Sequence, residues 1–542
     1  MTVGAALAGC GEHRLRETRL GPERGLFCGM GVCQDCLVTV DGKPSQRACV
    51  TKSEPGMAVS RQAFPGELPE ARMGAPPMEF EDIAAESADI VVVGGGAGGL
   101  SAALHVRRAG LDVLLLDERP ATGGQYFKQP TGAHALLDDQ QQEGSVLRAA
   151  VEAAGVRIVD GAEVWSAIDD LAMLATAHRR TFIARGKALI IATGAYERAQ
   201  PCPGWTLPGV MTTGAIQTLW RSYRVLPGKR ILIAGNGPLN LQVACEVIAG
   251  GALVPAVIEA APLLSPLKLG DAVRMALAGR ALSAKGLAML RRARASGAKL
   301  RFGRVIRRIT RTADGLVAET GALSGGPAEF WTVDAIGMGC GFLPSNELLR
   351  QLGAEHRYDA AAGMLRAVRS PECETTVPNV FAVGDCAGLG GAPAALAEGV
   401  IAGLAAARRL GLAINAETAD TLRQAEAGLA RHRRFQRALW SFYAAPRPGL
   451  ALAGGDTLVC RCEEISKRDL MQALEDGPAD IGEVKRRTRC GMGRCQGRYC
   501  APLIAEELSA RSGKPVTERD FFAPCGPLKP VTISDLAGAP RP

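Results

Sequence analysis

ADIVVVGGGAGGLSAALHVRRAGLDVLLLDE, residues 88–118, has the order strand, glycine-rich turn, helix, strand that is typical of a dinucleotide-binding unit. We expect Gly94 to make the tight turn, Gly96 to let the backbone approach a pyrophosphate, and Gly99 to let the helix approach the strand. The helix N-terminus then faces the phosphates. Asp117, or Glu118 if the strand is one residue longer, is predicted to bind the ribose hydroxyls.

Three later segments favour FAD over NAD as the dinucleotide. GGQ at residues 123–125 follows the second strand, and ALIIATGA at 188–195 ends a further strand. TTVPNVFAVGDCAGL at 375–389 places Asp385 after an apolar strand. The set resembles the FAD domain of two-dinucleotide-binding-domain flavoproteins, in which this aspartate holds the flavin ribitol. The residues assigned to FAD are Gly94, Gly96, Gly99, Asp117, Glu118, Gly124, Gln125, Val164, Thr193, Gly194, Gly384 and Asp385.

A second unit of the same kind, residues 229–262, lies between the two halves of the FAD domain. Its fingerprint is weaker, because Gly235 and Gly237 are present but Asn240 replaces the third glycine. We expect this asparagine to hold the helix farther from the strand. Glu259 is placed to bind a ribose hydroxyl, which favours NAD over NADP if a nucleotide binds. A purely structural Rossmann domain, or one for another nucleotide, remains an equal alternative.

Cysteine clustering indicates metal sites. Of 16 cysteines, nine fall in two tight groups near the two ends, so metal sites in a reducing cytoplasm fit better than disulfides. The flavin segments have no closely spaced cysteine pair beside them, which disfavours disulfide reduction. The isolated cysteines are predicted to be small buried residues; they are Cys202, Cys245, Cys340, Cys373 and Cys386.

The N-terminal group lies in GLFCGMGVCQDCLVTVDGKPSQRACV, residues 25–50. Its four cysteines, with gaps of four, two and twelve residues, have the plant-type [2Fe–2S] ferredoxin spacing. LVTVDGKP is expected to form a strand and turn that return the fourth cysteine to the cluster. Residues 2–17 are expected to be a helix, and the β-hairpin that usually precedes it is missing, so the recorded start is expected to be late. The predicted ligands are Cys28, Cys33, Cys36 and Cys49.

The C-terminal group has five cysteines for four ligand positions. Cys460 and Cys462 are one residue apart, and Cys490, Cys495 and Cys500 follow at gaps of four. A close pair followed about thirty residues later by a second pair resembles the bacterioferritin-associated ferredoxin domain, a small helical [2Fe–2S] module. That resemblance implies the ligands Cys460, Cys462, Cys495 and Cys500, with Cys490 as a bystander; the sequence alone leaves Cys490 open as a ligand.

The chain has, in order, a ferredoxin-type loop, an FAD domain with a nested Rossmann unit, and a C-terminal cluster domain. This order resembles that of the α (A) subunits of the opine oxidase and D-hydroxyproline dehydrogenase family, which is related to sarcosine oxidase α and hydrogen cyanide synthase subunits. WTLPGVMTTGAIQ at 205–217 and GNGPLNLQVA at 235–244 are typical of it. The resemblance implies an FAD and iron–sulfur electron-transfer subunit. A separate β subunit, which is a flavoprotein of the amino acid oxidase type, would oxidise a secondary amine or imino acid of opine, D-hydroxyproline, proline or sarcosine type.

Two alternatives stay open at this point. One is a self-contained NAD(P)H-dependent flavin oxidoreductase that passes electrons through its clusters. The other is an iron–sulfur scaffold whose flavin is structural. No catalytic residue is assigned, and the external acceptor, a quinone or another carrier, is not encoded in a motif.

Composition narrows the partners and the compartment. A formal charge of +8 over 542 residues is mild and aromatics are 4%, so nucleic acid is not expected as a partner. Residues 248–264, the best apolar stretch, contain Pro255 and Glu259, so no transmembrane segment is expected and the protein is predicted to be cytoplasmic.

The predicted fold is α/β, with a Rossmann-like FAD domain, a nested second Rossmann domain, an N-terminal ferredoxin-like α+β domain and a small C-terminal helical [2Fe–2S] domain. The predicted boundaries are 1–75 (ferredoxin-like), 86–205 (FAD, first part), 206–333 (nested), 334–412 (FAD, second part), 413–455 (helical linker) and 456–542 (C-terminal [2Fe–2S] domain and tail).

Overall fold

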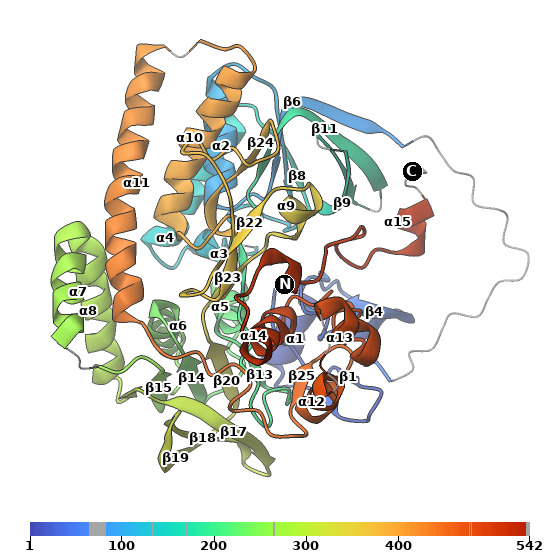
Figure 1. The fold of residues 1–542 in the computed structure, drawn as a ribbon, viewed down its shortest axis with the longest axis vertical. Helices are drawn as coiled ribbons and strands as arrows, with labels where there is room; N and C mark the ends of the chain where they lie inside the picture. Colours follow the sequence, from blue (N-terminus) through green and yellow to red (C-terminus); the bar gives the residue numbers. More distant parts are fainter. Residues whose placement is uncertain are drawn as a thin grey trace, which may run out of the picture.

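The computed structural model describes residues 1–63, 83–132, 134–169, 171–178, 180–263, 266–413, 415–475, 477 and 480–537. The predicted linker at 65–77 lies outside the described residues, and so does the boundary at 75. The described part confirms the predicted α/β architecture of a two-part FAD domain with a nested unit and a small domain at each end (Figure 1).

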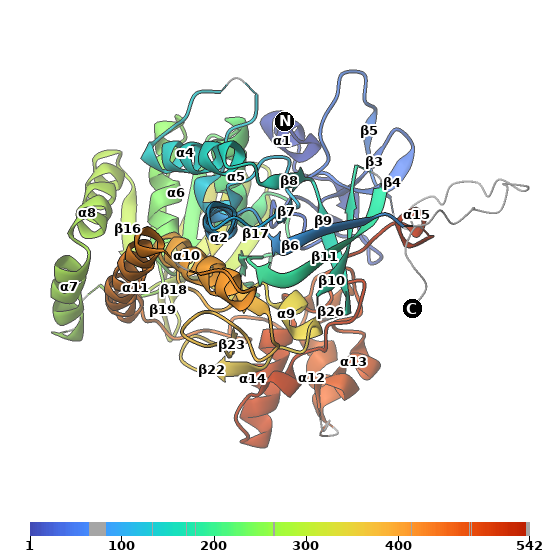
Figure 2. The same ribbon diagram turned by 90° about the horizontal axis from the view of Figure 1, so that it is seen from above.

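The FAD unit is built on a sheet in the order β8-β7-β6-β11-β10-β9, in which β24 also pairs with β11. The parallel members are buried on both faces, as shown by Val91 and Val92 at 0% exposure. Helices α2 and α10 pack against each other on one face, and α11 lies beyond α10 (Figure 2). The strands are β6 (Ala85–Val93), β7 (Val113–Asp117), β8 (Arg157–Asp160), β9 (Glu163–Asp169), β10 (Ala172–Ala177), β11 (Arg180–Ile191) and β24 (Val380–Ala382); the helices are α2 (Ala97–Arg108), α3 (Gly124–Phe127), α4 (Asp139–Ala153), α9 (Glu347–Gln351), α10 (Ala392–Arg409) and α11 (Ala416–Phe442).

The nested unit has a parallel five-stranded sheet in the order β13-β20-β14-β15-β16. Strand β20 lies between β13 and β14, so this sheet continues to Gly339, past the predicted boundary at 333. The sheet that a short strand joins is decided by its pairing with distant strands, here β13 and β14, and residues 335–339 carry no local pattern that marks it. The elements are β13 (Val210–Thr212), α5 (Thr213–Tyr223), β14 (Ile231–Gly235), α6 (Pro238–Ala249), β15 (Ala256–Glu259), α7 (Pro266–Ala278), α8 (Arg280–Ala295), β16 (Lys299–Phe302), β17 (Val305–Thr312), β18 (Gly315–Ala322), β19 (Gly325–Val333) and β20 (Ala335–Gly339).

Short antiparallel ladders complete the FAD unit. Strand β12 (Ala195–Glu197) pairs with β21 (Phe342–Pro344), which ties the chain leaving the FAD sheet to the chain returning to it. Strand β22 (His356–Asp359) pairs with β23 (Met364–Ala367), and the 3-10 turn η1 (Gly384–Cys386) follows β24.

The N-terminal unit contains a short helix and two small sheets. The expectation of a helix over 2–17 is correct only for α1 (Val3–Gly9): Cys10 caps it, Gly11 adopts a φ of +77°, and β1 (Arg16–Glu17) follows. The expected strand and turn are present as β3 (Leu37–Val40) and β4 (Lys43–Arg47), with β5 (Val59–Arg61) on the other side of β3 and β2 (Glu23–Arg24) paired with β1.

The C-terminal unit is mainly helical. A two-stranded ladder, β25 (Leu458–Cys460) and β26 (Ile465–Ser466), precedes α12 (Lys467–Glu475), α13 (Ile481–Thr488) and α14 (Ala501–Ser512). The tail then contains η2 (Glu518–Asp520) and α15 (Ile533–Ala537). Figure 1 shows the blue N-terminal and red C-terminal units below the FAD sheet, and hydrogen bonds such as Leu20 N–H to Glu464 Oε2 (3.2 Å) join them. Among the described residues, no helix is both long and apolar enough to cross a membrane.

Asn240 fills a buried space of the nested unit. Its side chain is 2% exposed; its amide donates to the Gly339 carbonyl (2.9 Å), and its amide oxygen accepts from the Thr213 hydroxyl (2.9 Å). The asparagine therefore links α6 to β20 and α5.

We expect Asn240→Ala to lower the free energy of unfolding by about 1–3 kcal/mol. It leaves the Thr213 hydroxyl buried without an acceptor and removes one of the two hydrogen bonds to the Gly339 carbonyl, which still accepts from the Asn236 N–H. Thermal unfolding of the FAD-loaded chain measures the loss. Adding Thr213→Val, which removes the orphaned hydroxyl, should recover part of it. An unchanged midpoint for Asn240→Ala would contradict this role.

Candidate functional site

The glycine-rich turn between β6 and α2 is shaped for close backbone approach. Gly94 has a φ of +104°, and a Cβ added to it would lie 2.4 Å from the carbonyl oxygen of Ala192. A Cβ added to Gly99 would lie 1.8 Å from the carbonyl oxygen of Gly94. The turn that holds Gly124 and Gln125 lies against this segment, since a Cβ at Gly124 would be 2.8 Å from the Gly96 Cα. The two predicted phosphate-side segments are therefore in contact.

Asp117 fits the predicted ribose contact better than Glu118 does. Asp117 ends β7 and is 5% exposed, and its Oδ2 has no hydrogen-bond partner among the described residues. Burial raises the pKa of its carboxyl to about 6, although the Arg119 N–H donates to Oδ1 at 2.9 Å. Glu118 instead forms an ion pair with Lys529 of the tail. An unsatisfied buried carboxylate oxygen is suited to accept a hydroxyl of an FAD ribose.

The remaining predicted flavin residues gather at the carboxyl edge of the sheet. Strands β11 and β24 pair in parallel, which brings Gly194 and Asp385 to the same edge as the turn after β6. The Asp385 carboxylate accepts from the Gly390 and Gly391 N–H groups, both at 2.8 Å, just before α10 begins. Thr193 donates its hydroxyl to the Ser345 carbonyl (2.7 Å), and Val164 is buried in β9.

Two buried titratable residues beside these segments were not predicted. Lys128, three residues after Gln125, donates to the Gly214 carbonyl (3.1 Å) and the Gln217 side chain (2.9 Å). Glu197, three residues after Gly194, accepts from the Gly214 N–H (2.8 Å), and its Oε1 has no partner among the described residues. Burial lowers the pKa of Lys128 to about 7 and raises that of Glu197 to about 7. Both can hold or release a proton near neutral pH, and only their closeness to the motifs could have identified them.

The glycine-rich turn of the nested unit is hydrogen-bonded to other parts of the chain. The Gly237 N–H donates to Glu259 (3.0 Å), and the Asn236 amide donates to Glu259 (2.8 Å) and to the Tyr443 carbonyl (2.9 Å). Residues 445–448, which follow α11, line a cavity of about 60 Å³ with Gly235 and Asn236. The Glu259 carboxylate, predicted for a ribose, is therefore already hydrogen-bonded.

The four predicted N-terminal ligands converge in a buried loop. The thiols of Cys28 and Cys33 are in contact, as are those of Cys36 and Cys49, and Cys28 also contacts Cys49. The Cys33 N–H donates to the Cys28 sulfur (3.4 Å), and the Gly31 N–H donates to the Cys49 sulfur (3.2 Å). Burial raises the pKa of the Cys28 thiol, but hydrogen bonds from Cys33 and Cys49 outweigh it and leave the pKa low. Two neighbouring pairs of sulfurs with backbone N–H donors fit a [2Fe–2S] cluster.

The five C-terminal cysteines also lie together. The Cys462 sulfur lies 3.5 Å from that of Cys495 and 3.8 Å from that of Cys460. The sulfurs of Cys460, Cys490 and Cys500 lie within 4.8 Å of one another, and all three residues are buried. Cys462 and Cys495 therefore form one pair of sulfurs, and Cys490 stands beside Cys460 and Cys500. The set fits a [2Fe–2S] cluster with one thiol to spare.

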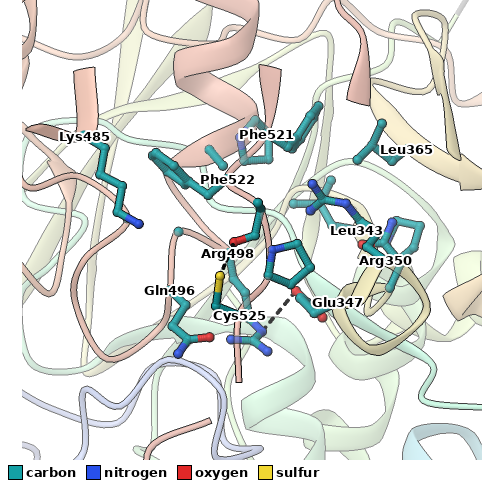
Figure 3. Close-up of a pocket in the computed structure, with 18 of the residues that line it drawn as sticks. Leu343, Glu347, Arg350, Leu365, Lys485, Gln496, Arg498, Phe521, Phe522 and Cys525 are labelled. Atoms are coloured by element: carbon teal, nitrogen blue, oxygen red, sulfur yellow. Dashed lines mark hydrogen bonds and ion pairs between the residues drawn. The ribbon is translucent and has the colours of Figure 1, made fainter. Parts of the chain in front are cut away.

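A cavity of about 310 Å³ lies between the FAD unit, the C-terminal cysteine loop and the tail (Figure 3). Phe521 and Phe522 of the tail form one side, and Arg498 makes an ion pair with Glu347 of α9 (3.0 Å) across the base. Because Gly491 and Gly497 also line the cavity, the cysteine loop has a face that the N-terminal unit does not cover.

Three family models match the segments of the chain that contain these residues. The family described as pyridine nucleotide-disulphide oxidoreductase matches residues 88–416. A 2Fe-2S iron-sulfur cluster binding domain matches residues 1–63, and a BFD-like [2Fe-2S] binding domain matches residues 458–510.

Two curated relatives match most of the chain. The chain is 31% identical to hydrogen cyanide synthase subunit HcnB of Pseudomonas aeruginosa over 470 residues, which cover 82% of this chain and 97% of that protein. It is 30% identical to the A subunit of opine oxidase from Agrobacterium tumefaciens over 470 residues, which cover 84% of this chain and 92% of that protein. L-proline dehydrogenase from P. horikoshii shares the fold, with a TM-score of 0.68 at 18% identity over 99% of this chain and 94% of that chain. The resemblance drawn from the sequence is confirmed.

The carboxyl of Asp117 predicts a pH dependence of FAD binding. Ribose hydroxyls donate to the ionised carboxylate, so binding should weaken as the pH falls through about 6, by up to about tenfold per pH unit. Titration of the apo chain with FAD, followed by flavin fluorescence between pH 5 and pH 8, measures it. Asp117→Asn should bind more weakly at every pH and show a flatter profile. The same flat profile in the wild type would contradict the assignment.

The five C-terminal cysteines predict unequal effects of single substitutions. Cys490→Ser should keep both clusters. Cys495→Ser should lose the C-terminal cluster, because the spare thiol of Cys490 stands beside Cys460 and Cys500 and not beside Cys462. Cys500→Ser should keep part of it through Cys490. Iron and sulfide analysis with low-temperature electron paramagnetic resonance (EPR) distinguishes these cases. Loss of the cluster in Cys490→Ser would make Cys490 a ligand and overturn the assigned set.

Proposed function

The chain belongs to the family of flavin and iron–sulfur oxidoreductase subunits that contains HcnB and the A subunit of opine oxidase, and from this premise we propose its function. It is the electron-transfer subunit of a heteromeric enzyme that oxidises a secondary amine or imino acid. It holds FAD and two [2Fe–2S] clusters, and a separate flavoprotein β subunit of the amino acid oxidase type carries the substrate pocket.

One observation carries the proposal: the flavin-side strand β12 and both cysteine loops meet in one apolar core. Cys28, Cys33, Cys495, Tyr196 of β12 and Tyr499 are all buried in it. The Phe27 carbonyl accepts from the Thr212 N–H at 2.9 Å, which attaches the N-terminal loop to the start of α5. The three proposed cofactor sites therefore share a continuous buried contact.

The residues of this core shield the cofactor sites from water and stabilise the thiolates. A bound flavin converts two-electron chemistry into single-electron steps, and iron–sulfur clusters carry single electrons. Phe27 contacts Tyr499 edge to face, with ring centres 5.6 Å apart, and Tyr196 contacts Tyr499 in the same way at 5.6 Å. These rings exclude water between the sites, and backbone N–H groups stabilise the thiolates.

The need for a partner is inferred from the burial of the site and from the relatives. Lys128 and Glu197 lie beside the flavin segments but are 2% and 6% exposed, so neither faces an open substrate pocket in the described residues. The two relatives are both named as subunits of larger enzymes. A quinone or another carrier is the proposed external acceptor.

Self-contained NADH oxidation has less support. The Gly237 N–H, which would have to bind a pyrophosphate, already donates to Glu259, and Tyr443 is hydrogen-bonded to the same turn. A bound NADH would have to displace both contacts.

The test is anaerobic reduction of the chain with and without a co-purified flavoprotein partner. The amines used as probes are octopine, D-hydroxyproline, L-proline and sarcosine. We expect at least one to bleach the flavin and reduce a dye acceptor only when both subunits are present, and NADH or NADPH to bleach nothing in the chain alone. A complex with Cys36→Ser should still oxidise the amine but no longer reduce the acceptor. Amine oxidation by this chain alone, or rapid bleaching by NADH, would overturn the proposal.

A further inference from the structure

A buried ion pair joins the two cysteine loops. Arg461 stands between Cys460 and Cys462, and Asp35 stands between Cys33 and Cys36. The Arg461 Nε donates to Asp35 Oδ2 at 2.6 Å, and a terminal guanidinium nitrogen lies 2.5 Å from the same oxygen. The two side chains are 6% and 2% exposed. The pair therefore spans 426 residues of sequence and connects the middle of one predicted ligand set to the middle of the other.

Aromatic rings and a backbone carbonyl fix the guanidinium in place. Its central carbon lies 3.9 Å from the ring centre of Phe27 and 4.5 Å from that of Trp205. The third nitrogen donates to the Trp205 carbonyl (3.1 Å), and the Trp205 indole N–H donates to the Leu458 carbonyl (2.9 Å). A planar guanidinium can stack and donate in this way, whereas a lysine ammonium cannot.

The surrounding charges leave an excess of positive charge at the junction. Arg16 donates to Asp35 (3.0 Å), and Arg24, which is 1% exposed, lies 3.6 Å from Glu464. Three guanidinium groups thus face two carboxylates, in a region that solvent does not screen. Asp35 is shared by two of these arginines.

Stability alone is a weak reason for this arrangement. Removing two charges from water costs several kcal/mol, and well-packed apolar side chains often stabilise such a position equally well. A net positive charge in a low-dielectric region does favour any neighbouring group in its more negative state. A [2Fe–2S] site with four thiolates becomes more negative by one charge on reduction.

We propose that Arg461 is a positioning residue for both cysteine sites: through Asp35 it fixes the distance between them, and its charge favours the reduced state of both. The inference rests on the proposed function, because it takes each site to hold a [2Fe–2S] cluster. It adds that the two sites form one electrostatic unit, so that a change at Arg461 acts on the N-terminal site as well as on its own loop.

The test is potentiometric titration of the full chain with dithionite, followed by low-temperature EPR and by iron and sulfide counts. The fully reduced wild type should show broadened or split signals from two neighbouring spins. Arg461→Gln should shift the reduction equilibrium of both clusters toward the oxidised state by about tenfold, about 59 mV for a one-electron couple, and weaken the spin interaction.

Three further variants keep the test decisive. Asp35→Asn, which removes the negative partner, should shift both potentials the opposite way. Arg461→Lys retains the charge, so it should stay near the wild-type potentials while losing part of the spin interaction. Arg468→Gln removes an exposed arginine that pairs with Asp456 (2.8 Å) in the same unit and should change neither quantity.

The contrary outcomes separate the two proposals. Two intact clusters without spin interaction, or a shift confined to the C-terminal cluster in Arg461→Gln, would overturn the bridge and leave the proposed function standing. Equal shifts in Arg461→Lys and Arg461→Gln would overturn the role of the charge. A wild-type chain with a single cluster would overturn both the cofactor set of the proposed function and the bridge.

Discussion

The pairing of β11 with two strands from distant parts of the chain is the constraint on which the rest of the structure depends. Strand β11 pairs in parallel with β6 on one side and, at Leu189, with Val380 of β24 on the other. Because parallel strands end at the same edge, this pairing brings the glycine-rich turn, Gly194 and Asp385 together. In the sequence, the nested unit lies between β11 and β24. The ladder of β12 with β21 joins the two segments that connect the nested unit to the FAD unit. The apolar core that receives both cysteine loops begins at this ladder, at Tyr196.

The buried carboxylates differ from site to site in whether their oxygens already have hydrogen-bond partners. At the flavin edge, Asp117 and Glu197 each have a carboxylate oxygen without a partner in the described part of the chain, which is suited to a ligand that donates hydrogen bonds. At the glycine-rich turn of the nested unit, the Glu259 carboxylate already accepts hydrogen bonds from Gly237 and Asn236, so it has less capacity to accept a hydrogen bond from a ligand. Both units have the same fold, so their capacity to bind a nucleotide depends on whether their polar groups are already satisfied.

The sequence predicts features that depend on local spacing. The fingerprint at 88–118, the second unit at 229–262 and the hairpin of β3 and β4 all have the predicted strands and helices. Each is set by glycine positions and apolar periodicity within some thirty residues. Contacts between distant residues were not predicted. The ion pair of Glu118 with Lys529 and that of Asp35 with Arg461 depend on the docking of whole units, and no local pattern marks them. Strand β20 was assigned to the wrong unit for the same reason, since its membership depends on pairing with β13 and β14.

The meeting of the two chain ends also constrains the order in which the molecule is assembled. Phe27 and Trp205 enclose the guanidinium of Arg461, so the N-terminal loop is not fully packed until the chain has been synthesised past residue 461. Until then Asp35 has Arg16 and Arg24 as charged neighbours but lacks Arg461. Arg461 adds a second ion pair to the Asp35 carboxylate, so docking of the C-terminal unit stabilises the N-terminal loop as well as its own. The two cysteine sites are therefore coupled during folding by the same contact that joins them in the finished structure.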